Sequence, residues 1–162
     1  MGFLYKSARV GKNGRKFNLY KIQTLKKTDS QFASEETYLP FGRFLRKSKL
    51  DELPQLWNIL RGDIAIVGPR AEEQRTIDVL PKDIREKLLS VKPGLTSPAS
   101  LHFFGEEKIL QLSDDPAKTY WEQIKPLKIA LDIWYIDNRC FVLDVALVWM
   151  TGWRVIGSFF RK

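Results

Sequence analysis

Two adjacent carboxylates, Asp51 and Glu52, are the residues of this sequence best suited to chemistry. They precede Pro54, which a helix tolerates only near its start. Either Asp51 is the N-cap of a helix reaching Leu60, or Ser48 caps it and Pro54 kinks it. In both arrangements the helix dipole favours ionised carboxylates. An ionised Asp is a competent nucleophile or metal ligand.

Cations near this pair in the sequence suggest an anionic ligand. Taken alone, an Asp at a helix start is more often a cap than a catalytic residue. Arg46 lies just upstream, Arg70 follows a Gly-Pro turn downstream, and Lys21 lies near the end of a predicted hairpin. Each is individually more often a solvated surface charge, but together they can surround a phosphate group with charge-assisted donors.

The elements that must position these residues follow from turn signals and apolar spacing. Asn13-Gly14 predicts a tight turn in a hairpin over residues 3–24, and the spacing from Leu50 to Leu60 predicts a helix with one buried face. We further expect a short strand over 64–67, helices over 72–80, 82–91, 118–138 and 140–160, and loops over 28–37 and 95–105. The predicted class is α+β, mostly helical, in a single domain over residues 1–162.

The composition limits the partners. A formal charge of +8 favours nucleic acid, acidic lipid headgroups or phosphorylated ligands. The single Cys140 excludes an internal disulfide and a thiolate-rich metal site, and His102 has no partner at metal-ligand spacing. Gly-rich phosphate loops and a Gly-x-Ser-x-Gly elbow are absent, so kinase, Rossmann and hydrolase interpretations lack support.

The helix predicted over 140–160 is strongly apolar. It contains Asp144 and Arg154, so its apolar runs fall short of the roughly 20 residues that a spanning helix requires. Trp149 and Trp153, with basic residues at the end of the sequence, suit an amphipathic helix at a membrane interface. A core helix of a basic soluble protein fits the same periodicity.

Three motifs occur in a characteristic order. They run from Lys49 to Asp63, from Ile66 to Arg70 and from Lys92 to Thr96. In this order they resemble the bacterial sugar transferase family of monotopic phosphoglycosyl transferases. The resemblance extends over essentially the whole chain, through Val10-Gly11-Lys12-Asn13-Gly14, Tyr20-Lys21, Asp132, Tyr135, Asp144 and Thr151.

The resemblance implies transfer of a sugar phosphate from a UDP-sugar to a polyprenol phosphate, which begins a surface glycan at the cytoplasmic face of the bacterial inner membrane. Asp51 would attack the β-phosphorus, release UMP and carry the phosphosugar covalently until the lipid phosphate attacks. Glu52 would act as metal ligand or proton acceptor, and Mg²⁺, held by Asp51 and Glu52, would offset the diphosphate charge. Lys21, Arg46 and Arg70 are the candidate phosphate contacts.

The resemblance also defines the expected partners, which are a UDP-sugar, polyprenyl phosphate and an anionic membrane surface. Association into a homo-oligomer is left open, and no nucleic-acid partner is expected. The family normally has a hydrophobic re-entrant helix before the hairpin, and this sequence begins with the hairpin itself. Either the chain is a shortened form of the family, or anchoring is expected from the C-terminal helices or from a partner.

Three positions depart from the family pattern. Ile22-Gln23 replaces Phe-Arg, a Gln of the first strand is replaced around Ser7, and Thr96-Ser97 replaces Thr-Gly. Two alternatives therefore accompany the enzyme hypothesis. One is a shortened homologue that binds a UDP-sugar, a membrane or a partner without catalysis. The other is a basic nucleic-acid-binding domain, which only the charge supports.

Overall fold

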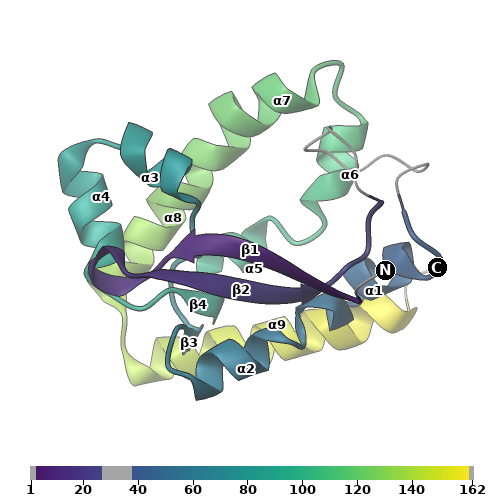
Figure 1. The fold of residues 1–162 in the computed structure, drawn as a ribbon, viewed down its shortest axis with the longest axis horizontal. Helices are drawn as coiled ribbons and strands as arrows, with labels where there is room; N and C mark the ends of the chain where they lie inside the picture. The colour runs from purple at the N-terminus through teal and green to yellow at the C-terminus, as the bar shows by residue number, and fades with distance from the viewer. Residues whose placement is uncertain (1–2, 27–37, 161–162) are drawn as a thin grey trace.

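The computed structural model describes residues 3–26 and 38–160. A long β-hairpin crosses the molecule, with α7 and α8 above it and α2 and α9 below it in the view of Figure 1. The first half of the chain forms β1 (Leu4–Val10), β2 (Lys16–Ile22), α1 (Gly42–Lys47), α2 (Gln55–Leu60), β3 (Ala65–Val67), α3 (Gln74–Val79) and α4 (Lys82–Leu89). The second half forms β4 (Gly94–Thr96), α5 (Pro98–His102), α6 (Glu106–Gln111), α7 (Pro116–Lys118), α8 (Lys125–Asn138) and α9 (Phe141–Phe160).

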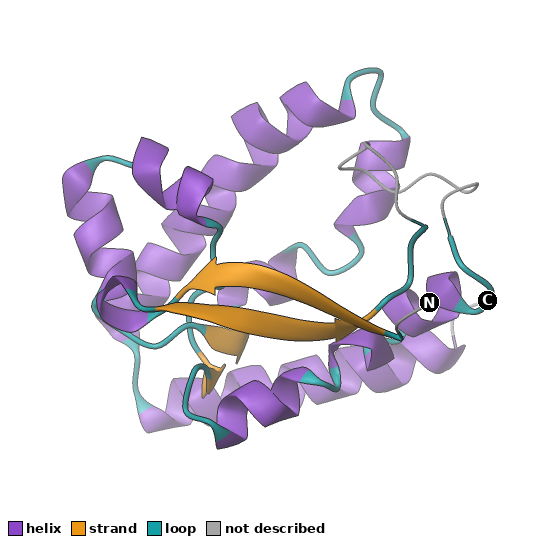
Figure 2. Ribbon diagram, viewed as in Figure 1, coloured by secondary structure: helices purple, strands orange, loops and turns teal. Residues whose placement is uncertain are grey.

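Helices dominate the structure, and the strands of the described residues form two small sheets (Figure 2). Short 3₁₀ segments, η1 (Lys12–Gly14) and η3 (Leu50–Glu52), lie in the hairpin turn and before α2, and the π-helical segment η4 (Thr119–Ile124) leads into α8. The predicted α+β class and the predicted N-terminal hairpin are confirmed. The loop predicted over 28–37 lies outside the described residues.

The hairpin turn has the backbone geometry that its sequence predicts. Asn13 and Gly14 adopt φ angles of 56° and 77°, in the left-handed region that Asn and Gly tolerate best. The antiparallel register runs from Leu4 opposite Ile22 to Val10 opposite Lys16. At the end of β1, the Val10 amide donates to the carbonyl of Glu72 at 2.9 Å, which attaches the hairpin to the segment that follows Arg70.

A parallel pair of short strands holds the second and third motifs side by side. Ala65 lies opposite Gly94, and Val67 lies opposite Thr96. The backbones approach so closely that a Cβ on Gly94 would lie 2.1 Å from the Gly68 nitrogen. Only glycine fits there. The two glycines therefore fix where the chain leaves β3 toward Arg70.

The orientation of α2 is opposite to the prediction. Its buried residues are the polar Gln55 and Asn58, whereas the apolar Trp57 and Leu60 are exposed, Leu60 by 79%. The Asn58 side chain accepts from the Tyr20 amide at 3.2 Å and donates to the Asn18 carbonyl at 2.8 Å. It thus satisfies backbone groups on the open edge of β2, and this requirement outweighs the apolar periodicity.

The expected irregular loop over 95–105 is also wrong, because it contains the end of β4 and all of α5. Ser97 caps α5 by accepting a hydrogen bond from the Ser100 amide at 3.1 Å, and Pro98 occupies the first turn. This is a normal helix start for a Ser-Pro sequence. The small residues around Ser97 are therefore a helix signal.

The C-terminal helix α9 is confirmed, and most of it faces outward. Its buried Leu147 packs with Leu101 of α5 and Tyr135 of α8 in a small core cluster. The 18 residues Phe141–Ser158 have a mean hydropathy of 1.3, and 11% of them are buried. By length and composition alone, this helix is long and apolar enough to cross a membrane, which is weak evidence by itself.

Replacing Asn58 by Ala is expected to lower the free energy of unfolding by about 2–4 kcal/mol, because the Tyr20 amide and the Asn18 carbonyl of β2 lose their partner and a fully buried side chain is removed. Leu60→Ala, on the same helix, is expected to cost less than about 1 kcal/mol, since Leu60 faces outward. Urea unfolding of both variants measures the difference. Equal losses, or a larger loss for Leu60→Ala, would contradict the observed orientation of α2.

Candidate active site

The two carboxylates lie in the 3₁₀ segment η3, before α2 begins. Both predicted caps are wrong: Asp51 is inside η3, α2 starts after Pro54, and the Ser48 hydroxyl donates back to the Phe44 carbonyl at 2.8 Å. Lys49, directly before η3, has a φ of 59°. A left-handed conformation costs a non-glycine residue roughly 1–2 kcal/mol, and here it redirects the chain into the carboxylate pair.

Glu52 is held by a cation from the hairpin. Lys21 Nζ lies 2.9 Å from Glu52 Oε1, and Lys49 Nζ lies 3.9 Å from the same oxygen. Burial by itself raises the pKa of Glu52, but Lys21, Lys49 and Arg70 outweigh it and lower that pKa to about 2. Glu52 is therefore ionised at neutral pH, and its charge is already compensated.

Asp51 has a different environment. It is 6% exposed, and its Oδ1 is shielded from solvent without a hydrogen-bond partner in the part of the chain that the structure describes. Burial, and then the charge of Glu52, raise its pKa. The expectation that a helix dipole favours the ionised form is thus wrong for Asp51, because burial dominates and η3 is only one turn long. The result is a more basic carboxylate with an unpaired oxygen.

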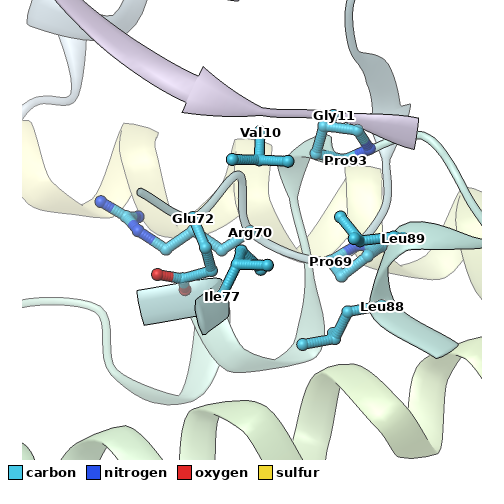
Figure 3. Close-up of a pocket in the computed structure, with 9 residues that line it drawn as sticks. All are labelled: Val10, Gly11, Pro69, Arg70, Glu72, Ile77, Leu88, Leu89 and Pro93. Carbon is cyan, nitrogen blue, oxygen red and sulfur yellow. The ribbon is translucent and has the colours of Figure 1, made fainter. Parts of the chain in front are cut away.

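Arg70 enters the same region from the turn after β3. Its backbone amide donates to Asp132 Oδ2 of α8 at 2.9 Å. Its guanidinium points away from Leu88, Leu89 and Pro93, as Figure 3 shows. Burial by itself lowers the pKa of Arg70. The negative charges of Glu52, Glu72 and Glu106 raise it by more, so the pKa of Arg70 lies above its usual value. The cavity that these apolar residues line has a volume of about 10 Å³, which is room for one water and too little for a ligand.

Arg46 is the least directly placed of the predicted phosphate contacts. Its guanidinium pairs with Glu107 of α6. It still lowers the pKa of Asp51 through its charge, so it lies within electrostatic reach of the pair. The structure therefore brings Lys21 and Arg70 to Glu52, and leaves Arg46 beside Asp51 with another carboxylate as its partner.

The prediction missed a set of buried charges on α8. Lys125, Lys128 and Asp132 are each 5% exposed or less. Lys125 Nζ lies 2.5 Å from Glu72 Oε2, and Lys128 pairs with Glu106. Spacing of three and four residues places the three side chains on one helix face. This spacing is the feature of the sequence that could have revealed them. Such a stripe normally predicts a solvated face, and here it faces the interior instead.

The carboxylates were also expected to hold Mg²⁺. No cluster of three or more His, Cys, Asp or Glu suited to a metal occurs among residues 3–26 and 38–160. Mg²⁺ is usually bound through one or two carboxylates, waters and substrate phosphates, so a larger cluster is not required. The unpaired Oδ1 of Asp51 fits this role, whereas Oε1 of Glu52 already holds Lys21.

The model of the family described as "Bacterial sugar transferase" matches residues 1–158. The chain belongs to the bacterial sugar transferase family. It is 36% identical over 163 residues to "Uncharacterized sugar transferase EpsL" of Bacillus subtilis (strain 168), covering 95% of this chain and 70% of that protein.

Two further bacterial sugar transferases have names that state a reaction. "UDP-N-acetylgalactosamine-undecaprenyl-phosphate N-acetylgalactosaminephosphotransferase" of Aeromonas hydrophila is 30% identical over 160 residues, covering 93% of this chain and 34% of that protein. "UDP-glucose:undecaprenyl-phosphate glucose-1-phosphate transferase" of Xanthomonas campestris pv. campestris is 30% identical over 165 residues, covering 95% of this chain and 31% of that protein. The chain thus spans about a third of the length of these two relatives.

Replacing Lys21 by Met is expected to destabilise this sugar transferase by about 2–4 kcal/mol, because Glu52 would remain buried without its cation. Adding Glu52→Gln to Lys21→Met should recover most of the loss, since no uncompensated charge remains. Denaturant unfolding of both single variants and the double variant gives the coupling energy. Simple additivity of the two losses would show that the pair is not coupled.

The stability contribution of Asp132 should depend on pH. Burial raises its pKa to about 6 against the opposing Arg70 amide, so the folded state binds the proton more tightly than the unfolded chain does. Stability from this group is therefore greatest below about pH 4 and is lost as the pH rises through 6. Relative to Asp132→Asn, the wild type should lose roughly 1–3 kcal/mol between about pH 4 and pH 7. A pH-independent difference in unfolding free energy would contradict the burial of the charge.

Proposed function

We propose that this chain is a phosphoglycosyl transferase that moves a sugar phosphate from a UDP-sugar to undecaprenyl phosphate through a covalent intermediate on Asp51. One observation carries the assignment of roles. Asp51 has a shielded oxygen without a partner among the described residues, while its neighbour Glu52 is ionised and paired with Lys21. A buried acceptor without a partner is costly, and it is typical of a group whose partner arrives with the substrate.

The reaction divides into two displacements at one phosphorus. In the first, an Asp51 oxygen forms a bond to the β-phosphorus of the UDP-sugar, and the bond from that phosphorus to the bridging oxygen breaks, so that UMP leaves. In the second, an oxygen of the lipid phosphate bonds to the same phosphorus, and the bond to Asp51 breaks. The product is a lipid diphosphate sugar, and the carboxylate is regenerated. Covalent catalysis of this kind replaces one difficult transfer with two easier ones.

The surrounding charges suit a diphosphate. Arg70 makes no close ion pair within the described residues, and its guanidinium is available for a bidentate phosphate contact. Lys21 and Arg46 supply further positive charge, although each already has a carboxylate partner. Mg²⁺ held by Asp51, with Glu52 beside it, would offset the charge on the diphosphate. Glu52 itself would set the electrostatic environment of Asp51 and position Lys21.

Two helices offer an apolar surface to the membrane that carries the acceptor. The exposed apolar residues after η3, in α2 and at the start of α9 include Leu53, Leu56, Trp57, Leu60, Phe141, Val142 and Val145. Both helices lie below the hairpin in Figure 1. Aromatic and aliphatic side chains of this kind bind at the headgroup boundary, and a net charge of +8 adds attraction to anionic lipids. We therefore assign the chain to the cytoplasmic face of the inner membrane, where UDP-sugars are available.

Release of UMP tests the enzymatic proposal. With Mg²⁺, a panel of UDP-sugars and detergent-dispersed undecaprenyl phosphate, the wild type should release UMP, and Asp51→Asn should release it at least about a thousandfold more slowly. Asp83→Asn, an exposed carboxylate of α4, is the matched control and should behave as the wild type. If no donor yields UMP where a longer relative works, the non-catalytic alternative is favoured.

Binding to lipid vesicles tests the membrane surface. The double variant Trp57→Ser/Phe141→Ser should bind vesicles containing phosphatidylglycerol at least about tenfold more weakly, because about 1.4 kcal/mol or more of apolar burial is lost. Trp134→Ser is the control, since Trp134 is 49% exposed on α8 and is not one of the residues named for this surface. Vesicle sedimentation measures the three affinities. Equal weakening by the control would show that the membrane does not select this face.

A further inference from the structure

A groove outside the carboxylate pair lies between α5 and α9. Its lining consists of Leu101, Trp149, Met150, Trp153 and Arg154, and this open groove has a volume of about 550 Å³. This volume falls within the range of roughly 300–1,000 Å³ that is typical of small-molecule sites. The walls are apolar, with one cation among them. Trp149 and Trp153 remain 73% and 70% exposed, so the groove opens outward on the face of α9 that the fold leaves uncovered.

Arg154 is the unusual residue of this groove, because the sequence of α9 carries only one other charge, Asp144 in its first turn. Its Nη1 donates to the Leu101 carbonyl at 2.6 Å, and its guanidinium carbon lies 5.7 Å from the centroid of the Phe104 ring. Both contacts hold the guanidinium at one end of the groove. Neither neutralises its charge, and no carboxylate pairs with it in the described ranges.

Phe104 connects this end of the groove to the carboxylate pair. Lys49 Nζ lies 5.6 Å from the centroid of the same ring, and 3.9 Å from Glu52 Oε1. The ring therefore has one cation beside the groove and another beside the active-site carboxylates. Arg154 and Lys49 thus share Phe104 as a neighbour, so an anionic head that leaves Arg154 for the carboxylate pair would next meet the Lys49 ammonium.

We propose that the groove is the acceptor subsite, in which the first isoprene units of polyprenyl phosphate lie against Trp149, Met150 and Trp153 with the phosphate at Arg154. This inference rests on the proposed function, and it adds a location that the carboxylate pair does not specify. The chemistry is complementary at both ends: an apolar wall matches the isoprenoid, and an uncompensated guanidinium matches the phosphate. The opening on the exposed face of α9 lets a lipid enter from the bilayer.

A kinetic experiment separates this subsite from the donor reaction. Arg154→Gln should raise KM for undecaprenyl phosphate about tenfold or more, since a charge-assisted phosphate contact is lost, whereas Arg154→Lys should retain most of the affinity. The burst of UMP released from the donor without acceptor should be unchanged in both variants, because Arg154 takes no part in the first displacement. Arg139→Gln, an exposed arginine of the α8–α9 connection, is the control.

A binding experiment gives a readout that does not require turnover. A benzophenone-bearing geranylgeranyl phosphate, photolysed with the wild type in detergent micelles, should label peptides of α5 and α9. Undecaprenyl phosphate should compete for this labelling, while phosphatidylglycerol and geranylgeraniol should not. Trp153→Ala, which removes an exposed groove wall, and Arg154→Gln should each reduce the labelling several-fold, with folding verified by circular dichroism.

The outcomes distinguish this inference from the function on which it rests. Without UMP release from the wild type, the proposed function fails, and labelling still decides the subsite. Labelling that phosphatidylglycerol displaces equally would identify a general lipid surface and overturn the subsite. An unchanged KM for undecaprenyl phosphate in Arg154→Gln would also overturn the subsite. A smaller UMP burst in Arg154→Gln than in the wild type would do the same.

Discussion

Glu52 stays ionised in a largely buried position because Lys21 reaches it from the hairpin, at 2.9 Å. The arrangement of the site depends on this ion pair. It attaches β2 to η3, so that a strand and a one-turn helix separated by about thirty residues form one unit. It also compensates the negative charge of Glu52, so that Asp51 is the carboxylate of the pair with an unpaired oxygen among the described residues. Without Lys21, repulsion between the two buried carboxylates would favour protonation of one of them. The structure would then not distinguish the proposed nucleophile from its ionised neighbour.

The same electrostatic demand shapes the packing around the site. Charged side chains face inward on α8, where Lys125, Lys128 and Asp132 are buried, and polar side chains face inward on α2. Apolar side chains consequently face outward on α2 and α9. For a protein in water alone this distribution is unfavourable, because large exposed apolar surfaces promote association. For a transferase whose acceptor is held in a bilayer, as we propose, the exposed apolar side chains of α2 and α9 are available to contact lipid.

Much of the fold was predictable where local chemistry decides it. Asn13-Gly14 defined the hairpin turn, and the length of the apolar pattern defined α9. The failures occurred where long-range contacts override local patterns. The face of α2 was wrong because the backbone edge of β2 needs the Asn58 amide, a demand that apolar spacing does not contain. The loop predicted over 95–105 is wrong because small residues such as Ser97 are typical of loops, although Ser97-Pro98 is also a normal helix start.

The site was predictable to a comparable extent. Lys21 lies beside Glu52, and Arg70 acts on Glu52 through its charge. The roles assigned to these residues and to Asp51 stay predictions. The direction of the Asp51 pKa was wrong, since burial is a tertiary property that a helix-start argument omits. The contribution of Lys49 was missed as well, because its left-handed backbone and its position beside Phe104 depend on the folded chain.

The division of roles between Asp51 and Glu52 is tested most directly by the mass of the protein after incubation with a UDP-sugar and Mg²⁺ in the absence of acceptor. The predicted result is an increase by one sugar phosphate on the peptide that contains Asp51. The increase should be absent in Asp51→Asn and should disappear from the wild type when undecaprenyl phosphate is added. An adduct on Glu52 or on any other residue, or UMP release without an adduct under rapid quenching, would contradict Asp51 as the nucleophile.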